Sequence, residues 1–210
     1  MTARGAQTIR LGFSSRSGAQ MRTLNAALAL FAERGVGATS YQMIADAIGV
    51  TKGAIYHQFN TKDQIIIAVA EMELAKLEDA LEAAEALDCR IEARELLLNL
   101  VIDHAIEHRR AANTLQFDPV IVRLLSDHEP FQRFIERLYG MLVGDEPGPD
   151  TQVRLAALTC VIGGTVSHPL VAGLDDDTLR SQLLEMVRRI VGLPQIAQRR
   201  TDRKSKRASA

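Results

Sequence analysis

Aromatic residues, proline and cysteine are all scarce in this chain of 210 residues. Aromatic side chains make up 4% of the sequence, tryptophan is absent, and only six prolines occur. Alanine, leucine and isoleucine are frequent instead, so helix is favoured over sheet, in which aromatic residues are usually enriched. Hydrophobic residues form 47% of the chain, which is enough for a substantial core in one larger domain or two small ones. The composition therefore predicts an all-α protein.

The two cysteines and the N-terminal residues bear on where the protein works. Cys89 stands among charged residues and Cys160 in an apolar run, and the pair forms neither a disulfide framework nor a metal-binding pattern. Cys160 is expected to be a small buried hydrophobic residue. Arg10 and Arg16 fall where a secretion signal needs its apolar segment, so no such signal is expected. A reduced, cytoplasmic compartment is therefore predicted.

Charge is distributed unevenly along the chain, although its net value is only −1. Residues 1–64 contain seven Lys or Arg against three Asp or Glu, and residues 194–210 contain six against one. Residues 65–193 contain twelve against twenty-two. This split is typical of a protein whose basic ends meet a polyanion while its acidic middle does not.

Residues 155–174 form an uncharged stretch of twenty residues, long enough to span a bilayer. Threonine, serine, histidine, proline and three glycines interrupt its apolar character. Such polar and small residues suit a helix buried inside protein or at a subunit interface. No membrane partner is therefore expected.

The N-terminal part of the chain carries the pattern of short capped helices. Between residues 20 and 34, four apolar side chains recur at the spacing of one helix face: Leu24, Ala27, Leu28 and Phe31. Gly35 follows as a natural stop. Ser40 is expected to cap a second short helix, which Gly49 ends.

A third short helix and a long fourth one follow. Thr51 is expected to cap the third helix, at 51–58. Thr61 followed by Gln64 predicts a capping box that opens the fourth helix. An apolar stripe continues along this helix at Leu74, Leu77, Leu81 and Ala84.

Beyond residue 88 the helices become apolar on more than one face, which predicts burial inside a bundle. Further helices are expected at 118–125, 130–143, 151–171 and 176–191. Residues 144–150 have the composition of a loop. Three aspartates at 175–177 are expected to cap the last helix rather than to bind calcium. The basic residues after Pro194 are expected to be a flexible tail, either solvated or serving as an accessory DNA arm.

Two short helices joined by a tight turn, with a supporting first helix, form the arrangement of a helix-turn-helix. In this motif the second helix enters the major groove of DNA. Gly53 would let its backbone approach phosphates closely, and the N-terminal end of the helix favours an anion. Polar groups suited to phosphates or base edges follow at Thr51, Lys52, Tyr56, His57 and Gln58.

Residues 37–69 read GATSYQMIADAIGVTKGAIYHQFNTKDQIIIAV. This segment resembles the DNA-binding domain of the TetR (tetracycline-repressor-like) regulators, and the preceding MRTLNAALALFAERG is similar to the first helix of that family. The resemblance covers roughly residues 20–70. The positions that match the family pattern are Gly37, Thr39, Ser40, Ile44, Ala45, Gly49, Val50, Thr51, Gly53, Ile55, Tyr56, Phe59, Thr61, Lys62 and Asp63.

The resemblance implies roles for individual residues. Phosphate contacts are implied for Ser40, Thr51, Tyr56 and Lys62. Six further residues are placed at the groove surface: Gln42, Lys52, Gly53, Ala54, His57 and Gln58. Ile48 departs from the alanine that is usual in the family, which is a change of packing only. Tyr41, at a usually aliphatic position, is expected to lie in the core.

The resemblance also implies the organisation of the whole chain. It implies an all-helical homodimer of about nine helices per subunit, joined through residues 151–191 and bound to a palindromic operator in double-stranded DNA. A small effector molecule, of unknown identity, would bind the C-terminal domain and release DNA through the helix that begins at Thr61. The segments expected are a flexible basic arm at 1–19, a DNA-binding domain at 20–64, a ligand-binding and dimerisation domain at 65–193 and a disordered basic tail at 194–210.

Other readings of the sequence are weaker. His104 and His108 are four residues apart, but no third metal ligand is fixed beside them, so no metal is expected. His104 and Phe117 are candidates for lining an effector pocket, although the phenylalanines of this region equally suit the core. A non-specific DNA protein is disfavoured because the acidic middle would repel DNA. No nucleophile with its base and no phosphate loop occurs, so neither an enzyme nor a cofactor is expected.

Overall fold

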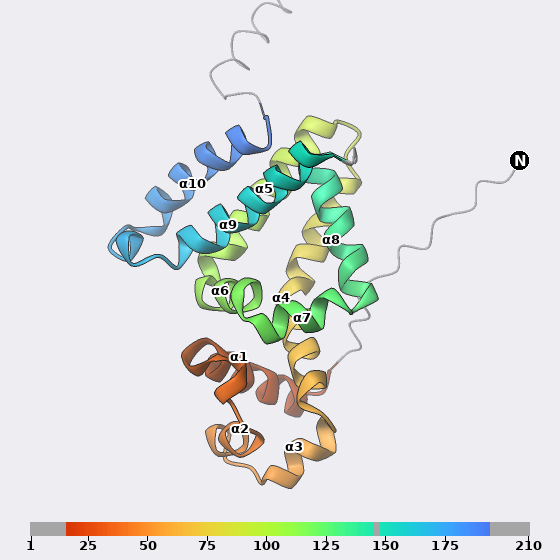
Figure 1. The fold of residues 1–210 in the computed structure, drawn as a ribbon, viewed down its shortest axis with the longest axis vertical. Helices are drawn as coiled ribbons and strands as arrows, with labels where there is room; N and C mark the ends of the chain where they lie inside the picture. Colours follow the sequence, from red (N-terminus) through yellow and green to blue (C-terminus); the bar gives the residue numbers. More distant parts are fainter. Residues whose placement is uncertain (1–15, 145–147, 194–210) are drawn as a thin grey trace, which may run out of the picture.

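The computed structural model of this chain describes residues 16–144 and 148–193, and the side chains of 110–113 are left out of the description. The predicted N-terminal arm, the 144–150 loop and the basic tail therefore lie wholly or partly outside the described residues. Figure 1 shows two helical parts connected by one long helix, α4. The helices are α1 Gly18–Ala38, α2 Tyr41–Ala47, α3 Lys52–Gln58, α4 Lys62–Glu85, α5 Arg90–Glu107, α6 Arg109–Phe117, α7 Pro119–Ser126, α8 Glu129–Leu142, α9 Pro149–Val166, the short 3-10 helix η1 Pro169–Val171, and α10 Asp176–Ile190.

Local sequence signals set the ends of α1. Ser17 and Gln20 form a capping box, so the helix starts slightly before the expected range. Gly35 adopts φ 78°, which interrupts the helical backbone at the predicted stop. The last residues of α1 therefore form a separate turn after the kink.

The caps of the next three helices agree with the sequence in all but one detail. The Ser40, Thr51 and Thr61 hydroxyl oxygens each accept a backbone N–H three residues later, at 3.2–3.3 Å. The predicted capping box of α4 is incomplete, because the Gln64 side chain accepts the N–H of Asn60 (2.8 Å) instead of that of Thr61. The chain enters α4 in an extended conformation that brings the Asn60 amide into reach of Gln64.

Two hydrophobic cores divide the molecule. One lies among α1, α2, α3 and the start of α4, and it also contains Ile121 and Leu125 of α7. The other contains the second half of α4 together with α5, α8, α9 and α10. Because α4 contributes to both cores, α7 packs into the N-terminal one and α6 contacts α1, the two parts are connected through three helices.

The C-terminal part differs from the sequence expectation in two elements. A separate helix, α6, follows a break at His108, where φ −113° and ψ 35° depart from helical geometry. It brings the number of α-helices in the described part of the chain to ten, against about nine expected. The helix expected at 151–171 ends at Val166, because Pro169 cannot continue it and favours an extended conformation at His168.

Two further predictions concern the cap of the last helix and the uncharged stretch at residues 155–174. The Asp175 carboxylate accepts the N–H of Thr178 at 2.9 Å, which is the expected cap of α10. Within the described ranges, none of the helices combines the length and the apolar character that a membrane crossing requires.

Candidate nucleic-acid interface

Helices α2 and α3 pack against each other with their apolar sides inward. Ile44, Ala45 and Ile55 are at most 1% exposed. The turn between the helices uses Gly49 at φ 68°, in the left-handed region that favours glycine. The opposite side of α3 faces solvent at one end of the molecule (Figure 1). This geometry leaves a short helix free to enter a groove.

Tyr56 stands on that exposed side and is held by another aromatic ring. Its ring stacks on Tyr41, with centroids 4.3 Å apart and planes 8° from parallel. The Tyr41 hydroxyl donates to the carbonyl oxygen of Phe59 at 3.2 Å, which fixes the Tyr41 ring. The Lys52 ammonium lies 5.6 Å from the Tyr56 ring centre. Tyr41, expected in the core, is thus half-buried and supports the exposed ring.

The cap residues place hydroxyl groups on the same surface. Ser40 and Thr51 are exposed, and their oxygens accept the N–H groups of Met43 and Ala54. A hydroxyl that accepts in this way still has its own proton to donate. Each hydroxyl group can therefore donate to a phosphate oxygen while its own oxygen still caps the helix.

Gly53 is not required by the fold. A Cβ atom built on it would meet only the Thr51 Oγ1 atom, at an ordinary contact distance of 3.8 Å, and its φ is not positive. Alanine would stabilise a helix interior by about 1 kcal/mol relative to glycine. The glycine therefore leaves backbone surface open toward solvent without serving the internal packing.

Lys62 has a partner inside the protein. Its ammonium donates to the carbonyl oxygens of Val36 at 2.5 Å and Gly37 at 3.5 Å, near the C-terminal end of α1. The side chain is half-buried. The phosphate contact implied for Lys62 stays a prediction. In such a contact the ammonium would have to bind the phosphate while it also donates to the carbonyl oxygens at the end of α1.

Two glutamines of the predicted surface also have internal partners. The Gln58 amide oxygen accepts the hydroxyl of the buried Thr23 at 3.0 Å, so α3 is tied to α1 at this end. The Gln42 amide donates to Asp46 at 2.7 Å. His57 is exposed in the last turn of α3, and Ala54 is half-buried. Lys52 and His57 are exposed, and no side-chain hydrogen bond is described for either of them.

The effector contacts predicted for His104 and Phe117 stay predictions. An apolar cavity of about 300 Å³ occupies the C-terminal part, and neither His104 nor Phe117 lines it. Phe117 is 45% exposed. His104 instead borders an open depression beside Lys76 and Glu107. The cavity lining comes from α4 to α9, and Phe131 and Tyr139 of α8 are part of it.

His104 belongs to a group of titratable residues at the centre of the molecule. Burial, with help from His108 and Lys76, lowers the pKa of His104 to about 4, so the ring is neutral near pH 7. The rings of His104 and His108 are 4.7 Å apart. His108 Nδ1 lies 3.6 Å from the buried Glu73 carboxylate, and burial raises the pKa of that carboxyl group.

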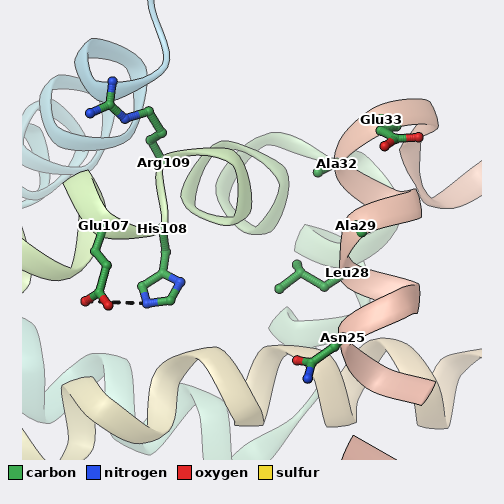
Figure 2. A pocket seen from close by; sticks show the side chains of 8 residues that line it. All are labelled: Asn25, Leu28, Ala29, Ala32, Glu33, Glu107, His108 and Arg109. Carbon is green, nitrogen blue, oxygen red and sulfur yellow. Dashed lines mark ion pairs between the residues drawn. The ribbon is translucent and has the colours of Figure 1, made fainter. Parts of the chain in front are cut away.

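A second cavity, of about 380 Å³, lies between the two parts of the molecule. Figure 2 shows Asn25 and Leu28 of α1 opposite Glu107 and His108, with Arg109 directed away from α1. Arg109 pairs with Asp176 of α10. In the part of the chain that the structure describes, no group of three His, Cys, Asp or Glu residues is arranged to hold a metal ion.

Apolar side chains remain exposed on the last elements of the chain. Val153 is 68% exposed, Leu170 87% and Met186 47%. Cys160, expected to be buried, is exposed on α9. The apolar run around Cys160 is therefore buried on one side only, with Leu158 and Ile162 in the core and Cys160 on the exposed side.

Comparisons with known proteins agree with this geometry. The model for bacterial regulatory proteins of the tetR family matches residues 24–69. The HTH-type transcriptional repressor Rv3405c of Mycobacterium tuberculosis is 30% identical over 206 residues, which cover 91% of this chain and 98% of that repressor. This chain belongs to the TetR family of transcriptional regulators. It is a helix-turn-helix DNA-binding regulator, and regulators of this family are not enzymes.

Other relatives match a part of the chain or its fold alone. The HTH-type transcriptional repressor KstR2 of Rhodococcus jostii is 43% identical over 53 residues, which is 25% of this chain. The match spans only about a quarter, 26%, of the length of KstR2. FadR from Bacillus subtilis, a transcriptional regulator solved in complex with stearoyl-CoA, is 20% identical with a TM-score of 0.61. The alignment covers 80% of this chain and 96% of FadR, and it shows a shared fold.

Proposed function

We propose that this protein is a ligand-responsive repressor that binds a palindromic operator as a homodimer and is released by a small apolar effector. The exposed side of α3, with Tyr56 held on Tyr41, is the observation that carries the DNA-binding part of the proposal. The full-length similarity to a transcriptional repressor supports repression as the outcome. The regulator would act in the cytoplasm, where its operator is located.

The proposed DNA contacts divide into two kinds. Ser40, Thr51 and Tyr56 contact phosphates, because their hydroxyl groups are exposed around α3. Lys52 and His57 are the accessible candidates for base edges or nearby phosphates. The remaining proposed contacts are of two kinds. Gly53 and Ala54 would contact DNA through the backbone. The side chains of Gln42, Gln58 and Lys62 would contact DNA although they also have partners inside the protein.

Dimerisation is proposed through α9 and α10, within residues 151–191. Val153, Leu170 and Met186 expose apolar side chains there, which a subunit interface would cover. A two-fold dimer presents two copies of α3 to DNA. The operator half-sites would then be related by two-fold symmetry and spaced by whole turns of the double helix.

The effector would occupy the apolar cavity of about 300 Å³ in the C-terminal domain. FadR of Bacillus subtilis, which shares the fold, holds stearoyl-CoA. Leu74 and Leu77 of α4 border the cavity, and α4 begins directly after α3. A ligand that binds more tightly when α4 is displaced would move α3 and weaken DNA binding.

A mobility-shift assay on the DNA upstream of the protein's own gene tests the proposal. The full-length protein is expected to form a sequence-preferring complex at moderate salt, and a mutated half-site should weaken it. Analytical ultracentrifugation should give a dimer in the absence of DNA. The lack of any sequence-preferring complex would contradict the proposed function.

A further inference from the structure

The apolar cavity of the C-terminal domain has a lining without charge. Its walls come from six helices, α4 to α9, and the described residues that line it include no Asp, Glu, Lys, Arg or His. By contrast, Glu33, Glu107 and Arg109 border the cavity between the two parts of the molecule. A charged group inside the apolar cavity would lose its hydration without gaining a counter-charge. The lining therefore disfavours ligands whose charge must enter.

The hydroxyl groups of the lining give their protons to acceptors within the protein. The Thr159 hydroxyl donates to the carbonyl oxygen of Leu155 at 2.9 Å, so the 2.8 Å hydrogen bond between Tyr139 and Thr159 uses the Tyr139 proton. The Ser126 hydroxyl donates to the carbonyl oxygen of Arg123 at 2.7 Å. A carboxylate or phosphate group accepts hydrogen bonds only, and these three hydroxyl groups have no further proton to offer it.

The remaining polar side chain of the described lining is Gln116. Its carboxamide is neutral, and one neutral hydrogen bond makes only a modest net contribution to binding. Removing an anion from water costs considerably more than such a bond returns. Gln116 therefore does not suit the cavity to an anion.

The volume of the cavity limits the size of its ligand. An apolar cavity of about 150 Å³ holds benzene, a molecule of six carbon atoms. The cavity of this protein, at about 300 Å³, has room for about twelve non-hydrogen atoms on the same scale. A long acyl chain or a coenzyme A group exceeds this volume.

We propose that the apolar cavity takes an uncharged, largely apolar ligand of about ten to fifteen non-hydrogen atoms, and excludes carboxylates and coenzyme A thioesters. This inference rests on the proposed effector-binding function and adds the charge and the size of the effector. An uncharged molecule enters without losing ionic hydration. Its apolar body gains contacts with the leucine, isoleucine and valine side chains of the wall.

A pair of probes of equal size tests the exclusion of charge. Decanamide and decanoate have the same number of non-hydrogen atoms, and at neutral pH only decanoate is charged. Their binding to the full-length protein is measured by titration calorimetry, together with that of decanoyl-coenzyme A. Decanamide should bind at least tenfold more tightly than either of the other two. Equal or tighter binding of decanoate or decanoyl-coenzyme A, or no binding of decanamide, overturns the inference.

A series of amides of increasing chain length tests the size limit. Each added methylene group buries more apolar surface as long as the cavity has room for it. Affinity should therefore rise from hexanamide through octanamide to decanamide. Tetradecanamide should bind no more tightly than decanamide, because its chain exceeds the available volume. Tighter binding of tetradecanamide overturns the size limit.

Variants that fill the cavity test whether the amide binds there. Val101 of α5 and Ile135 of α8 are half-buried residues of the lining. Val101→Phe and Ile135→Phe each place a ring where the ligand would lie, and each should weaken decanamide binding at least tenfold. Ile91→Phe, at an exposed position of α5 outside the lining, is the matched control and should bind decanamide as the wild type does. Unfolding midpoints show which variants fold, and undiminished binding by either folded cavity variant overturns the inference.

Operator binding, measured separately, distinguishes this inference from the proposed function. If decanoate binds as tightly as decanamide while the ligand-free protein still binds its operator, the ligand class is wrong and the DNA-binding function stands. If decanamide binds as expected but does not release the operator, the ligand class stands and the proposed effector response is wrong.

Discussion

Asp118 of the C-terminal domain accepts a hydrogen bond from the backbone N–H of Val36, with its Oδ2 atom 3.0 Å from the nitrogen. Its Oδ1 atom accepts the N–H groups of Val120 at 2.9 Å and Ile121 at 3.4 Å. One carboxylate therefore caps α7 and binds the end of α1 at the same time. The carbonyl oxygen of Val36 accepts the Lys62 ammonium, so this peptide unit is held from both sides.

This arrangement would give α7 a part in the proposed coupling between effector and DNA. Val122 and Ser126 of α7 border the apolar cavity, whereas Ile121 lies in the N-terminal core. A ligand that shifts α7 would pull on α1 through Asp118. The proposed route through α4 thus has a parallel connection through α7 to the end of α1.

Replacing Asp118 with alanine should destabilise the protein by about 1–3 kcal/mol, because a helix cap and the partner of a half-buried N–H are both lost. Chemical denaturation of the full-length protein measures the change. Asp127→Ala at the other end of α7, where the side chain is exposed, should stay within about 0.5 kcal/mol of the wild type. Equal stability of the two variants would show that the Asp118 contacts contribute nothing.

Removing the hydroxyl group of Tyr56 should weaken DNA binding without destabilising the fold. The stacked ring is retained in Tyr56→Phe, so the loss is one phosphate hydrogen bond, about 1 kcal/mol or roughly fivefold in affinity. The loss should be similar for different DNA sequences, since phosphates carry no sequence information. Fluorescence anisotropy with the operator and with unrelated DNA measures both values.

Tyr41→Phe is the matched control for this change. It removes a hydroxyl group from the ring beneath, whose partner is the carbonyl oxygen of Phe59. The cost should therefore appear mainly in unfolding free energy rather than in DNA affinity. If Tyr56→Phe leaves the affinity intact, the proposed phosphate contact is wrong.

Gly53→Ala should have opposite effects on the stability of the fold and on the affinity for DNA. Because a Cβ atom has room there, the variant should be more stable by about 0.5–1 kcal/mol. Operator affinity should nevertheless fall, about tenfold if the methyl group holds the backbone away from the DNA, which is about 1.4 kcal/mol. Thermal unfolding and anisotropy measurements on the same preparation check the two signs. Unchanged affinity would show that the DNA does not approach this backbone closely.

His104 should make stability depend on pH in the acidic range. Its pKa falls from the ordinary value of 6.5 to about 4 on folding, mainly because the ring is buried. Between these values the unfolded chain binds the proton more readily, so stability is unaffected above about pH 6.5 and decreases as the pH falls toward 4. The loss should be on the order of 1–3 kcal/mol after allowance for partial exposure to solvent.

His104→Gln should remove this contribution. The difference in unfolding free energy between wild type and variant should change between pH 6.5 and 4 and be constant above that range. His168→Gln, at an exposed histidine, should leave the wild-type pH dependence unchanged. A difference that is independent of pH would show that His104 is protonated equally in both states. Glu73, whose pKa is raised by burial, contributes with the opposite sign and is present in all three proteins.

Features determined by neighbouring residues could be predicted from the sequence. The caps at Ser40 and Thr51 and the stops at Gly35 and Gly49 depend on local hydrogen bonds and backbone conformation, and all four occur where the sequence places them. The break at His108 carries no glycine or proline, so nothing local marked the start of α6.

Features that depend on distant residues could not be predicted. Gln58 and Thr23 are 35 positions apart, and Lys62 and Val36 are 26 apart, so only the folded chain shows that these polar groups have internal partners. Phe117 and His104 are pocket candidates by residue type alone, and neither borders the apolar cavity, whose lining includes Gln116 and Tyr139. Polarity within one segment cannot show which side of a helix the tertiary structure covers.

The exposed apolar surface of α10 should be needed for the proposed dimer, and Met186→Glu tests this. A carboxylate at a buried interface position loses hydration without a partner, so the dimer should dissociate at least tenfold more readily, and operator affinity should fall with it. Ser181→Glu adds the same charge at an exposed position elsewhere on α10 and should leave the dimer intact. Sedimentation velocity over a range of protein concentrations measures the dissociation. If Met186→Glu sediments as the wild type does, the dimer contacts lie on another surface. The spacing of the two copies of α3 is then set by elements other than α9 and α10.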